Sequence, residues 1–371
     1  MNKKVLLLYS LSNQSHLVIN VVERMRKLGV CIDAFNVTEW NYVCGDKSLP
    51  FSFRILRHLL CTKLFAPMVR HYVYVPLLLR VSKEYDYVDI HFFAYSYLPF
   101  LKRLQKPYKI TIWGSDFYRE SKDNQEAKRL YYRNAVMVQV ETEEVKRDLV
   151  KFEPSLAEKV VVCNFGVDIL DSIFAIVDDS PLVKESSRIG RTVVTVGYNG
   201  SKGQQHLLLI RALDALPRSY KERLFIYIPA TYGLTPGYKR ELLYALEQIQ
   251  IPYHLFENRL SEPDLAKLRK ESDIALNAQI TDTLCASLLQ HLYAGSIVIV
   301  GEWLPYGIFD RHNIVYFKAT KDGFKDRILY CLDHINDIKA STKGNSNKVL
   351  EFATWNAVSN KQYDIYRALF S

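Results

Sequence analysis

The stretch TVVTVGYNGSKGQQHLLLIRALDAL, residues 192–216, decides the fold class because it contains a strand, a turn and a helix in succession. Thr192–Val196 is a run of β-branched residues without charge, which is typical of a buried parallel strand. Gly197–Gly203 contains three glycines, and Gln205–Leu216 has apolar residues at helical spacing. This order predicts the opening of a Rossmann-type domain.

The same alternation continues on both sides of this stretch. Polar residues with a proline and a glycine at 175–190 separate two series, so we predict a linker there and an α/β fold of two Rossmann-like domains. The upstream strands are predicted at Val5–Tyr9, Val30–Val37, Tyr87–Phe93, Tyr108–Trp113, Ala135–Val140 and Lys159–Cys163, and the downstream ones at Leu224–Ile228, Ile274–Leu276 and Ile297–Val300.

Composition narrows the class of protein. The chain has 371 residues, of which 49% are hydrophobic and 24% charged, so disorder and fibrous repeats are excluded. The net charge of +9 favours an anionic partner. Six scattered cysteines form no metal or redox motif, and no apolar run is long enough to span a membrane. The short apolar run Val5–Tyr9 lacks a small-residue cleavage site, so we expect no signal peptide. We expect a cytoplasmic protein, with any membrane contact peripheral at the inner face.

One segment concentrates the positive charge. Phe51–Lys83 contains six cations and no acid within an apolar, aromatic stretch. It is either a helical hairpin with a solvated basic face or a surface that binds anionic lipid. The cations are not interleaved with aromatics over a basic face, so nucleic acid is not the expected partner.

Several segments resemble, in the same order, those of GT-B glycosyltransferases, which transfer a sugar from a nucleotide-sugar donor. Asp89–His91 and Trp113–Asp116 are similar to a strand ending in histidine and a Gly-Ser-Asp turn of the acceptor domain. Gly197 with Ser201–Gly203 is similar to the turn that opens the donor domain. Three further segments resemble the turn that closes the first domain, the turn near the nucleotide base and the terminal helix: Asn164–Asp168, Leu260–Leu265 and Glu351–Phe370.

The resemblance implies two Rossmann-like domains facing each other across a cleft. The acceptor domain would comprise residues 1–175 and the nucleotide-sugar donor domain residues 191–350, with 351–371 a helix that crosses back to the first domain. A narrower similarity, in segments that include Gly197–Gly200, Ile228–Gly233 and Thr283–Cys285, is to acetamidofucosyl transferases that act on polyprenyl-diphosphate-linked oligosaccharides.

The chain departs from the family at four positions. Two glutamates on the last donor-site helix correspond to Asp282 and Gln290, which shortens one carboxylate and replaces the other by an amide. The arginine that usually follows the strand's glycine is Tyr198, and the histidine of the Gly-Ser-Asp motif is Trp113. These changes leave the donor and the retaining outcome open.

The donor site is expected around the turn after residue 196. Lys202 would stabilise the leaving diphosphate beside the turn glycines, or it is an ordinary surface lysine. Asn199, Gln204 and Thr283 would donate hydrogen bonds, or they serve the turn and a helix N-cap. The remaining donor-binding candidates are Gly197, Tyr232, Asp282 and Gln290.

Asp116 and His91 are the candidates for the base that activates the acceptor hydroxyl. Asp116 follows a predicted strand at the carboxyl edge of the sheet, but it could instead be an N-cap. His91 ends an apolar strand and could be a buried, hydrogen-bonded histidine. No Asp-x-Asp follows a predicted strand, so neither a metal nor another cofactor is expected.

The residues and the resemblance together predict an enzyme, a hexosyltransferase of GT-B type. It would move a sugar from a nucleotide-sugar to a lipid-linked or other saccharide acceptor in bacterial surface polysaccharide synthesis, such as capsule or O-antigen. The alternative is a catalytically degenerate GT-B domain that acts as a sugar-nucleotide-binding or scaffold subunit, because two family carboxylates are altered.

Overall fold

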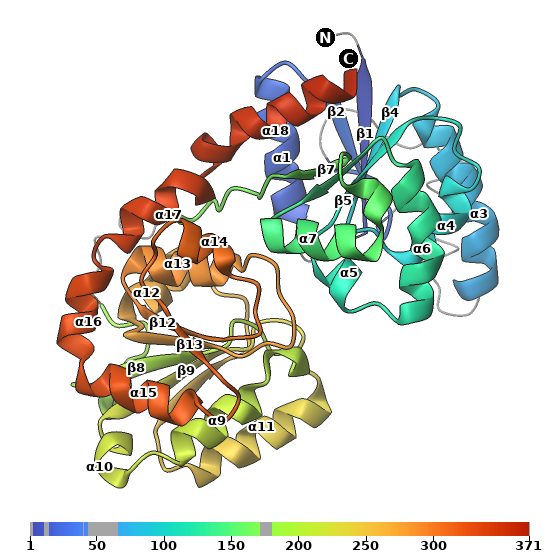
Figure 1. Ribbon diagram of the computed structural model, residues 1–371. Coiled ribbons are helices and arrows are strands. Elements are labelled where there is room, and N and C mark those ends of the chain that lie inside the picture. Colours follow the sequence, from blue (N-terminus) through green and yellow to red (C-terminus); the bar gives the residue numbers. More distant parts are fainter. Residues whose placement is uncertain (1–2, 11–14, 40, 44–65, 171–179, 371) are drawn as a thin grey trace. The chain divides into compact units, whose positions relative to one another are not determined.

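The computed structural model describes residues 3–10, 15–39, 41–43, 66–170 and 180–370 (Figure 1). The chain divides into two compact units. Unit 1 comprises Met1–Phe165 and Val358–Ser371, and unit 2 comprises Gly166–Ala357. The division therefore falls inside the turn 164–168. The predicted end of the first domain, residue 175, lies about ten residues later in the chain.

Unit 1 is built on a sheet that has seven strands among the described residues, in the order β3-β2-β1-β4-β5-β6-β7. All neighbours pair in parallel except β2 and β3. The order reverses between β1 and β4, which makes their carboxyl ends the switch point of the sheet. The strands are β1 Lys4–Tyr9, β2 Cys31–Asn36, β3 Asn41–Tyr42, β4 Tyr87–His91, β5 Tyr108–Thr111, β6 Met137–Val140 and β7 Val160–Val162.

Helices cover both faces of this sheet (Figure 1). Two of them begin at side-chain caps, because the Ser121 hydroxyl accepts from Asn124 N and the Thr142 hydroxyl accepts from Val145 N. The core is apolar, with Leu6, Val88 and other strand residues completely buried. The helices are α1 Ser15–Lys27, α3 Ala66–Ser82, α4 Leu98–Leu101, α5 Ser115–Tyr118, α6 Lys122–Asn134 and α7 Glu143–Phe152.

The terminal helix α18, Trp355–Phe370, belongs to unit 1 from Val358 onward. Gln362 exchanges hydrogen bonds with Gln139 of β6, and Lys3 Nζ donates to the carbonyl of Phe370 at 2.7 Å. The two ends of the chain therefore lie together on unit 1 (Figure 1). The sequence predicted one helix over Glu351–Phe370, but the extended backbone at Thr354 separates α17 from α18.

Unit 2 contains a fully parallel sheet, with six strands among the described residues, in the order β10-β9-β8-β11-β12-β13. Its order reverses between β8 and β11, so a second switch point lies at their carboxyl ends. The strands are β8 Thr192–Val196, β9 Leu224–Pro229, β10 Tyr253–Phe256, β11 Ile274–Asn277, β12 Ile297–Gly301 and β13 Phe317–Ala319.

Separate apolar clusters pack on the two faces of this sheet. One joins α9, α11 and α15 to residues such as Val194 and Ile226, and the other joins α12 and α13 to Val298 and Val300. Such two-sided coverage is expected for a parallel sheet. The helices are α9 His206–Asp214, α10 Arg218–Lys221, α11 Pro236–Gln248, α12 Glu262–Glu271, α13 Ala286–Ala294, α14 Gly307–Arg311, α15 Phe324–Asp333, α16 Ile335–Thr342 and α17 Asn345–Ala353.

The α/β fold, with one mostly parallel and one fully parallel sheet, confirms the predicted fold class. Part of the predicted linker at 175–190 lies outside the described residues, and the rest packs on unit 2. Leu182 N donates to Glu271 at 2.7 Å, and Val183 is buried against β8 and β9. These residues therefore belong to the second unit.

Candidate functional site

The carboxyl ends of β8 and β11 form the candidate site of unit 2. β8 ends at Val196 and runs into Gly197, whose φ of +68° is a conformation that favours glycine. A Cβ at this position would lie 2.8 Å from His206 Nε2, so a side chain has no room. Gly197 therefore allows the chain to turn sharply over the start of α9.

The turn after Gly197 is held by the side chain of Asn199, which agrees with the turn role predicted as one alternative for this residue. Asn199 Oδ1 accepts from Ser201 N at 2.9 Å, and its Nδ2 donates to the Tyr232 hydroxyl at 3.3 Å. Gly200 N donates to the carbonyl of Tyr232 at 2.7 Å. The structure thus brings together three of the predicted donor residues: Gly197, Asn199 and Tyr232.

Gln279, directly beyond β11, is a residue that the sequence did not single out. It is completely buried, and its Oε1 accepts from Gln204 Nε2 at 2.9 Å and from the Tyr198 hydroxyl at 3.1 Å. Gln204 Oε1 accepts from Tyr198 N, which fixes the orientation of both amides. Gln279 Nε2 is then left as a buried donor without an acceptor among the described residues. Such a group costs about 1–3 kcal/mol unless another molecule supplies the acceptor.

Lys202 does not point into this network. Its side chain is 72% exposed and lies 3.3 Å from Glu241 of α11, with the Tyr238 ring 5.8 Å away. An exposed ion pair of this kind contributes little to stability, about 0–1 kcal/mol. The geometry matches the surface-lysine alternative, and a role toward a diphosphate stays a prediction.

Asp282 and Thr283 do not start a helix, which corrects the prediction that α13 begins there. α13 begins at Ala286 after the extended residue Cys285. Asp282 instead accepts hydrogen bonds from the Tyr306 hydroxyl and from Thr283 N, and Thr283 is buried. The two residues belong to the loop between β11 and α13, so Asp282 and Gln290 do not share a helical face.

Gln290 lies on α13, one turn from its start, and is 7% exposed. Its Oε1 accepts from Nε of Arg269 on α12 at 3.0 Å. Arg269 is itself buried, and it could not be selected from the sequence because a buried arginine has no periodic signature.

In unit 1, the Asp116 carboxylate joins the turns that follow β4 and β5. Its Oδ2 accepts from Phe93 N at 2.7 Å and its Oδ1 from Trp113 N at 2.9 Å. Phe92 between β4 and this contact has φ of +57°, an unusual value for a side chain of its size. Burial raises the pKa of Asp116 to about 6, although both backbone donors and Lys128 oppose the shift.

His91 belongs to a buried polar network beneath α18. The His91 Nε2 atom lies 3.2 Å from Asp89 Oδ2, which also pairs with Lys109 Nζ at 3.0 Å and accepts from the Tyr366 hydroxyl at 2.7 Å. Burial lowers the pKa of His91, although Asp89 opposes the shift. Burial alone would raise the pKa of Asp89, but Lys109 and His91 hold it well below its usual range.

His91 itself is sealed from solvent, as the buried-histidine alternative predicted. Its ring lies 5.9 Å from that of Trp113 and 5.8 Å from that of Phe165, and its Nδ1 has no hydrogen-bond partner among the described residues.

The basic segment at 51–83 is described only from residue 66. α3 contributes Val75, Leu77, Leu78 and Val81 to the buried core, so these apolar side chains are not free to enter a membrane. The cations Arg54, Arg57 and Lys63 lie outside the described residues. No helix of the described residues has the length and apolar character needed to span a bilayer.

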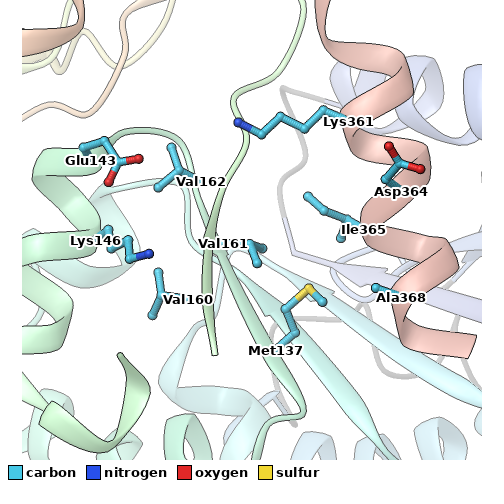
Figure 2. Close-up of a pocket in the computed structure, with 10 residues that line it drawn as sticks. All are labelled: Met137, Glu143, Lys146, Val160, Val161, Val162, Lys361, Asp364, Ile365 and Ala368. Atoms are coloured by element: carbon cyan, nitrogen blue, oxygen red, sulfur yellow. The ribbon is translucent and has the colours of Figure 1, made fainter. Parts of the chain in front are cut away.

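A groove of about 420 Å³ lies in unit 1 between the edge strand β7 and α18 (Figure 2). Met137, Val161 and Ile365 line its floor, and Lys146 and Lys361 stand at its sides (Figure 2). None of the predicted site residues lines this groove. Likewise, the side chains that the structure describes contain no cluster of three potential metal ligands.

Comparison with known proteins supports the fold without giving a sequence family. No protein-family model matches the chain, and no curated protein matches its sequence. Solved structures match over the full length. A glycosyltransferase from Rickettsia africae is 17% identical with a TM-score of 0.72 and 100% coverage of both chains. Anabaena Alr3699/HepE, solved with UDP and glucose, is 14% identical with a TM-score of 0.75, covering 99% of this chain and 100% of its own.

A third match is the sucrose-phosphate synthase of Thermosynechococcus elongatus, 11% identical with a TM-score of 0.71 and 99% coverage of both chains. Identities this low establish a shared fold and no more. The two parallel sheets and these full-length matches together mean that the chain has the GT-B fold.

Proposed function

We propose that the chain is a GT-B glycosyltransferase that transfers a sugar from a nucleotide-sugar donor to a saccharide acceptor. The observation that carries the proposal is the match to Anabaena HepE, solved with UDP and with UDP-glucose, over 99% of this chain. The resemblance of short motifs in the same order, noted from the sequence, is independent support.

The chemistry requires hydrogen-bond donors around the leaving group. Breaking the bond between sugar and nucleotide places negative charge on the diphosphate. The switch point of unit 2 is where such donors are expected, because the turn beginning at Gly197 leads into the start of α9 at the carboxyl ends of β8 and β11. We therefore assign the donor to unit 2.

Asp116 of unit 1 is the base that we propose for the acceptor hydroxyl. A pKa of about 6 leaves it ionised at neutral pH yet able to accept a proton. His91 is sealed in the core, which favours a positioning role for the rings of Trp113 and Phe165 over direct contact with substrate.

We further propose a lipid-linked acceptor and a role in bacterial surface polysaccharide synthesis. The support is the net charge of +9 and the concentration of cations at 51–83. Of the apolar residues in this segment, Val75, Leu77, Leu78 and Val81 are already buried in the core. Anionic lipid attracts each nearby cation by about 1 kcal/mol.

Sedimentation with anionic liposomes tests this membrane contact. Changing Arg54, Arg57 and Lys63 to glutamate is expected to release the protein from the liposomes. The control makes the same charge change at three exposed positions of unit 2: Arg218, Lys321 and Lys343. Equal sedimentation of both triple variants with the parent would contradict the proposal.

A thermal-shift screen tests the function itself. The probes are UDP, TDP, GDP, ADP and CDP with their common nucleotide sugars, and a ligand that binds the native protein raises its melting temperature by mass action. One base is expected to give a clear shift, and its nucleotide sugar should then be consumed with acceptor present. Binding without turnover would favour the binding-subunit alternative, and no shift from any probe would contradict the proposal.

A further inference from the structure

Lys128 of α6 is a lysine whose side chain is completely buried in unit 1. Its Nζ donates to Glu120 Oε1 at 2.6 Å and to the main-chain carbonyl of Asp116 at 2.9 Å. Lysines are almost never fully buried unless they are paired, because an ammonium group loses its hydration in the interior. Glu120 supplies the pairing, and the second contact places the cation at the residue that we propose as the base.

The same ammonium group contacts a second residue of the turns that Asp116 joins. Lys128 Nζ lies 5.3 Å from the centre of the Phe93 ring, within the range of a cation–π interaction. The main-chain N–H of Phe93 donates to Asp116 Oδ2 at 2.7 Å. Lys128 therefore contacts both partners of this hydrogen bond, Asp116 through its carbonyl and Phe93 through its ring. One side chain of α6 thus fixes the carboxylate and its donor relative to each other.

The ionisable neighbours of Asp116 come from α6 and from the segment before it. Those on α6 are Lys128 and Tyr132, whose hydroxyl is buried without a hydrogen-bond partner among the described residues. Glu120, between α5 and α6, is the acid that pairs with Lys128. Burial raises the pKa of Asp116 to about 6, and the Phe93 N–H and the charge of Lys128 limit the rise. Lys128 therefore brings positive charge to the carboxylate, and Glu120 partly offsets it.

Toward the strands, this carboxylate meets main-chain groups. The N–H groups of Phe93 and Trp113, in the turns after β4 and β5, donate to its two oxygens. The side chains of His91 in β4 and Lys109 in β5 face Asp89 instead, at 3.2 Å and 3.0 Å. The charge that acts on the carboxylate therefore comes from the α6 side of the turn.

We infer that Lys128 is a positioning residue for the proposed base, because it holds the Asp116 carboxylate in place and keeps it ionised at neutral pH. With no exposed surface, Lys128 cannot contact a substrate and acts through Asp116 alone. The inference rests on the proposed function, since a base must be ionised to accept the proton of the acceptor hydroxyl. Glu120 sets how strongly the lysine acts, because it is the acid that neutralises the ammonium group.

Two substitutions in the ion pair should move the titration of Asp116 in opposite directions. Lys128→Met removes the cation, so the titration midpoint should rise from about 6 by at least about half a pH unit. Glu120→Gln removes the acid but keeps an acceptor for the lysine, so the midpoint should fall. Lys151→Met, the same substitution at an exposed position of α7, is the matched control and should leave the midpoint unchanged. A merely structural role would not produce opposite shifts.

Carbon-13 NMR of the full chain labelled at aspartate carboxyl carbons would measure the midpoints without any substrate. The Asp116 resonance is the one that disappears in Asp116→Asn. A Lys128→Met midpoint equal to that of the parent would overturn the inference. Should Lys128→Met not fold, Glu120→Gln decides alone, because a midpoint that stays or rises in this variant would overturn the inference equally.

The pH profile of transfer links these midpoints to the reaction. The acid limb of the transfer rate should move to higher pH in Lys128→Met and to lower pH in Glu120→Gln, in step with the NMR midpoints. Midpoints that move while the acid limb stays in place would overturn the role of Lys128 in transfer but leave the glycosyltransferase proposal intact. A parent protein that consumes no nucleotide sugar would instead contradict the proposed function, and the NMR midpoints would still show whether Lys128 keeps the carboxylate ionised.

Discussion

Replacing Asp116 by asparagine changes two opposing contributions to the stability of unit 1. The carboxylate accepts two backbone N–H groups, from Phe93 at 2.7 Å and from Trp113 at 2.9 Å. An asparagine has one acceptor oxygen, so one of these N–H groups would face an NH₂ group, at a cost of about 1–3 kcal/mol. The variant also removes a buried charge. Because burial raises the pKa of Asp116 to about 6, keeping this charge at pH 7 lowers the free energy of unfolding by about 3 kcal/mol. We expect the net change at pH 7 to be within about 2 kcal/mol.

The pH dependence isolates the second contribution. As pH falls from 7 to 5, folded Asp116 takes up a proton near pH 6, whereas the unfolded chain does so only near pH 4. The folded state binds more protons over this range, so lowering the pH stabilises the parent. Relative to Asp116→Asn the parent should gain about 1 kcal/mol between pH 7 and pH 5, measured by denaturant unfolding. A stability difference that does not change with pH would refute this account of the carboxylate.

Transfer kinetics of the same variant test the proposed role as a base. Nucleotide affinity should be unchanged because the donor is assigned to unit 2, while the transfer rate should fall by about 10²–10⁴-fold. The parent should lose activity on the acid side of pH 6, where Asp116 becomes protonated. Full activity of the folded Asp116→Asn variant would show that the carboxylate only joins the two turns.

Three other predictions come from the sequence and the structure. Lys202→Ala is expected to lower the transfer rate by up to about 10²–10³-fold without changing stability. The control Glu241→Ala removes the ion-pair partner of Lys202 and should not lower the transfer rate. Equal activity of Lys202→Ala and the parent would show that Lys202 is not part of the site. Lys109→Met should destabilise the protein by about 3–5 kcal/mol in thermal unfolding, because it leaves Asp89 buried without its cation. The double variant Asp89→Leu with Lys109→Met should recover much of this loss, because it removes the buried charge as well. Transfer should persist in EDTA, because the sequence places no Asp-x-Asp after a predicted strand; loss of activity restored by added Mg²⁺ would contradict this.

The central strands of both sheets could be predicted because they are buried on both faces and read as continuous apolar runs. Val5–Tyr9 and Ile297–Val300 are examples, and each lies within one residue of its observed strand. The edge strands β10 and β13 were missed, because they are short and only partly buried and so contain polar residues such as His254 and Lys318.

The turn residues of the candidate site could also be predicted, since glycine and asparagine mark them locally. The side chains that complete the site could not be predicted, because they come from segments far apart in the sequence. Gln279 and Tyr198 are 81 residues apart, and Arg269 reaches Gln290 across two helices, so only the packing of α12 on α13 reveals their contact. In unit 1, Tyr366 reaches Asp89 over 277 residues, a contact that no local pattern encodes.

Transfer itself can be measured by incubating the full-length protein with each nucleotide sugar and a lipid extract from bacterial membranes, and quantifying the nucleoside diphosphate released. The GT-B assignment predicts that one nucleotide sugar is consumed, that release depends on the extract, and that the sugar is recovered on extracted lipid. Recovery on a water-soluble saccharide instead would exclude the lipid-linked acceptor but keep the transferase. If none of the nucleotide sugars is consumed, and none of the nucleoside diphosphates binds, the proposal that this chain is a glycosyltransferase is contradicted.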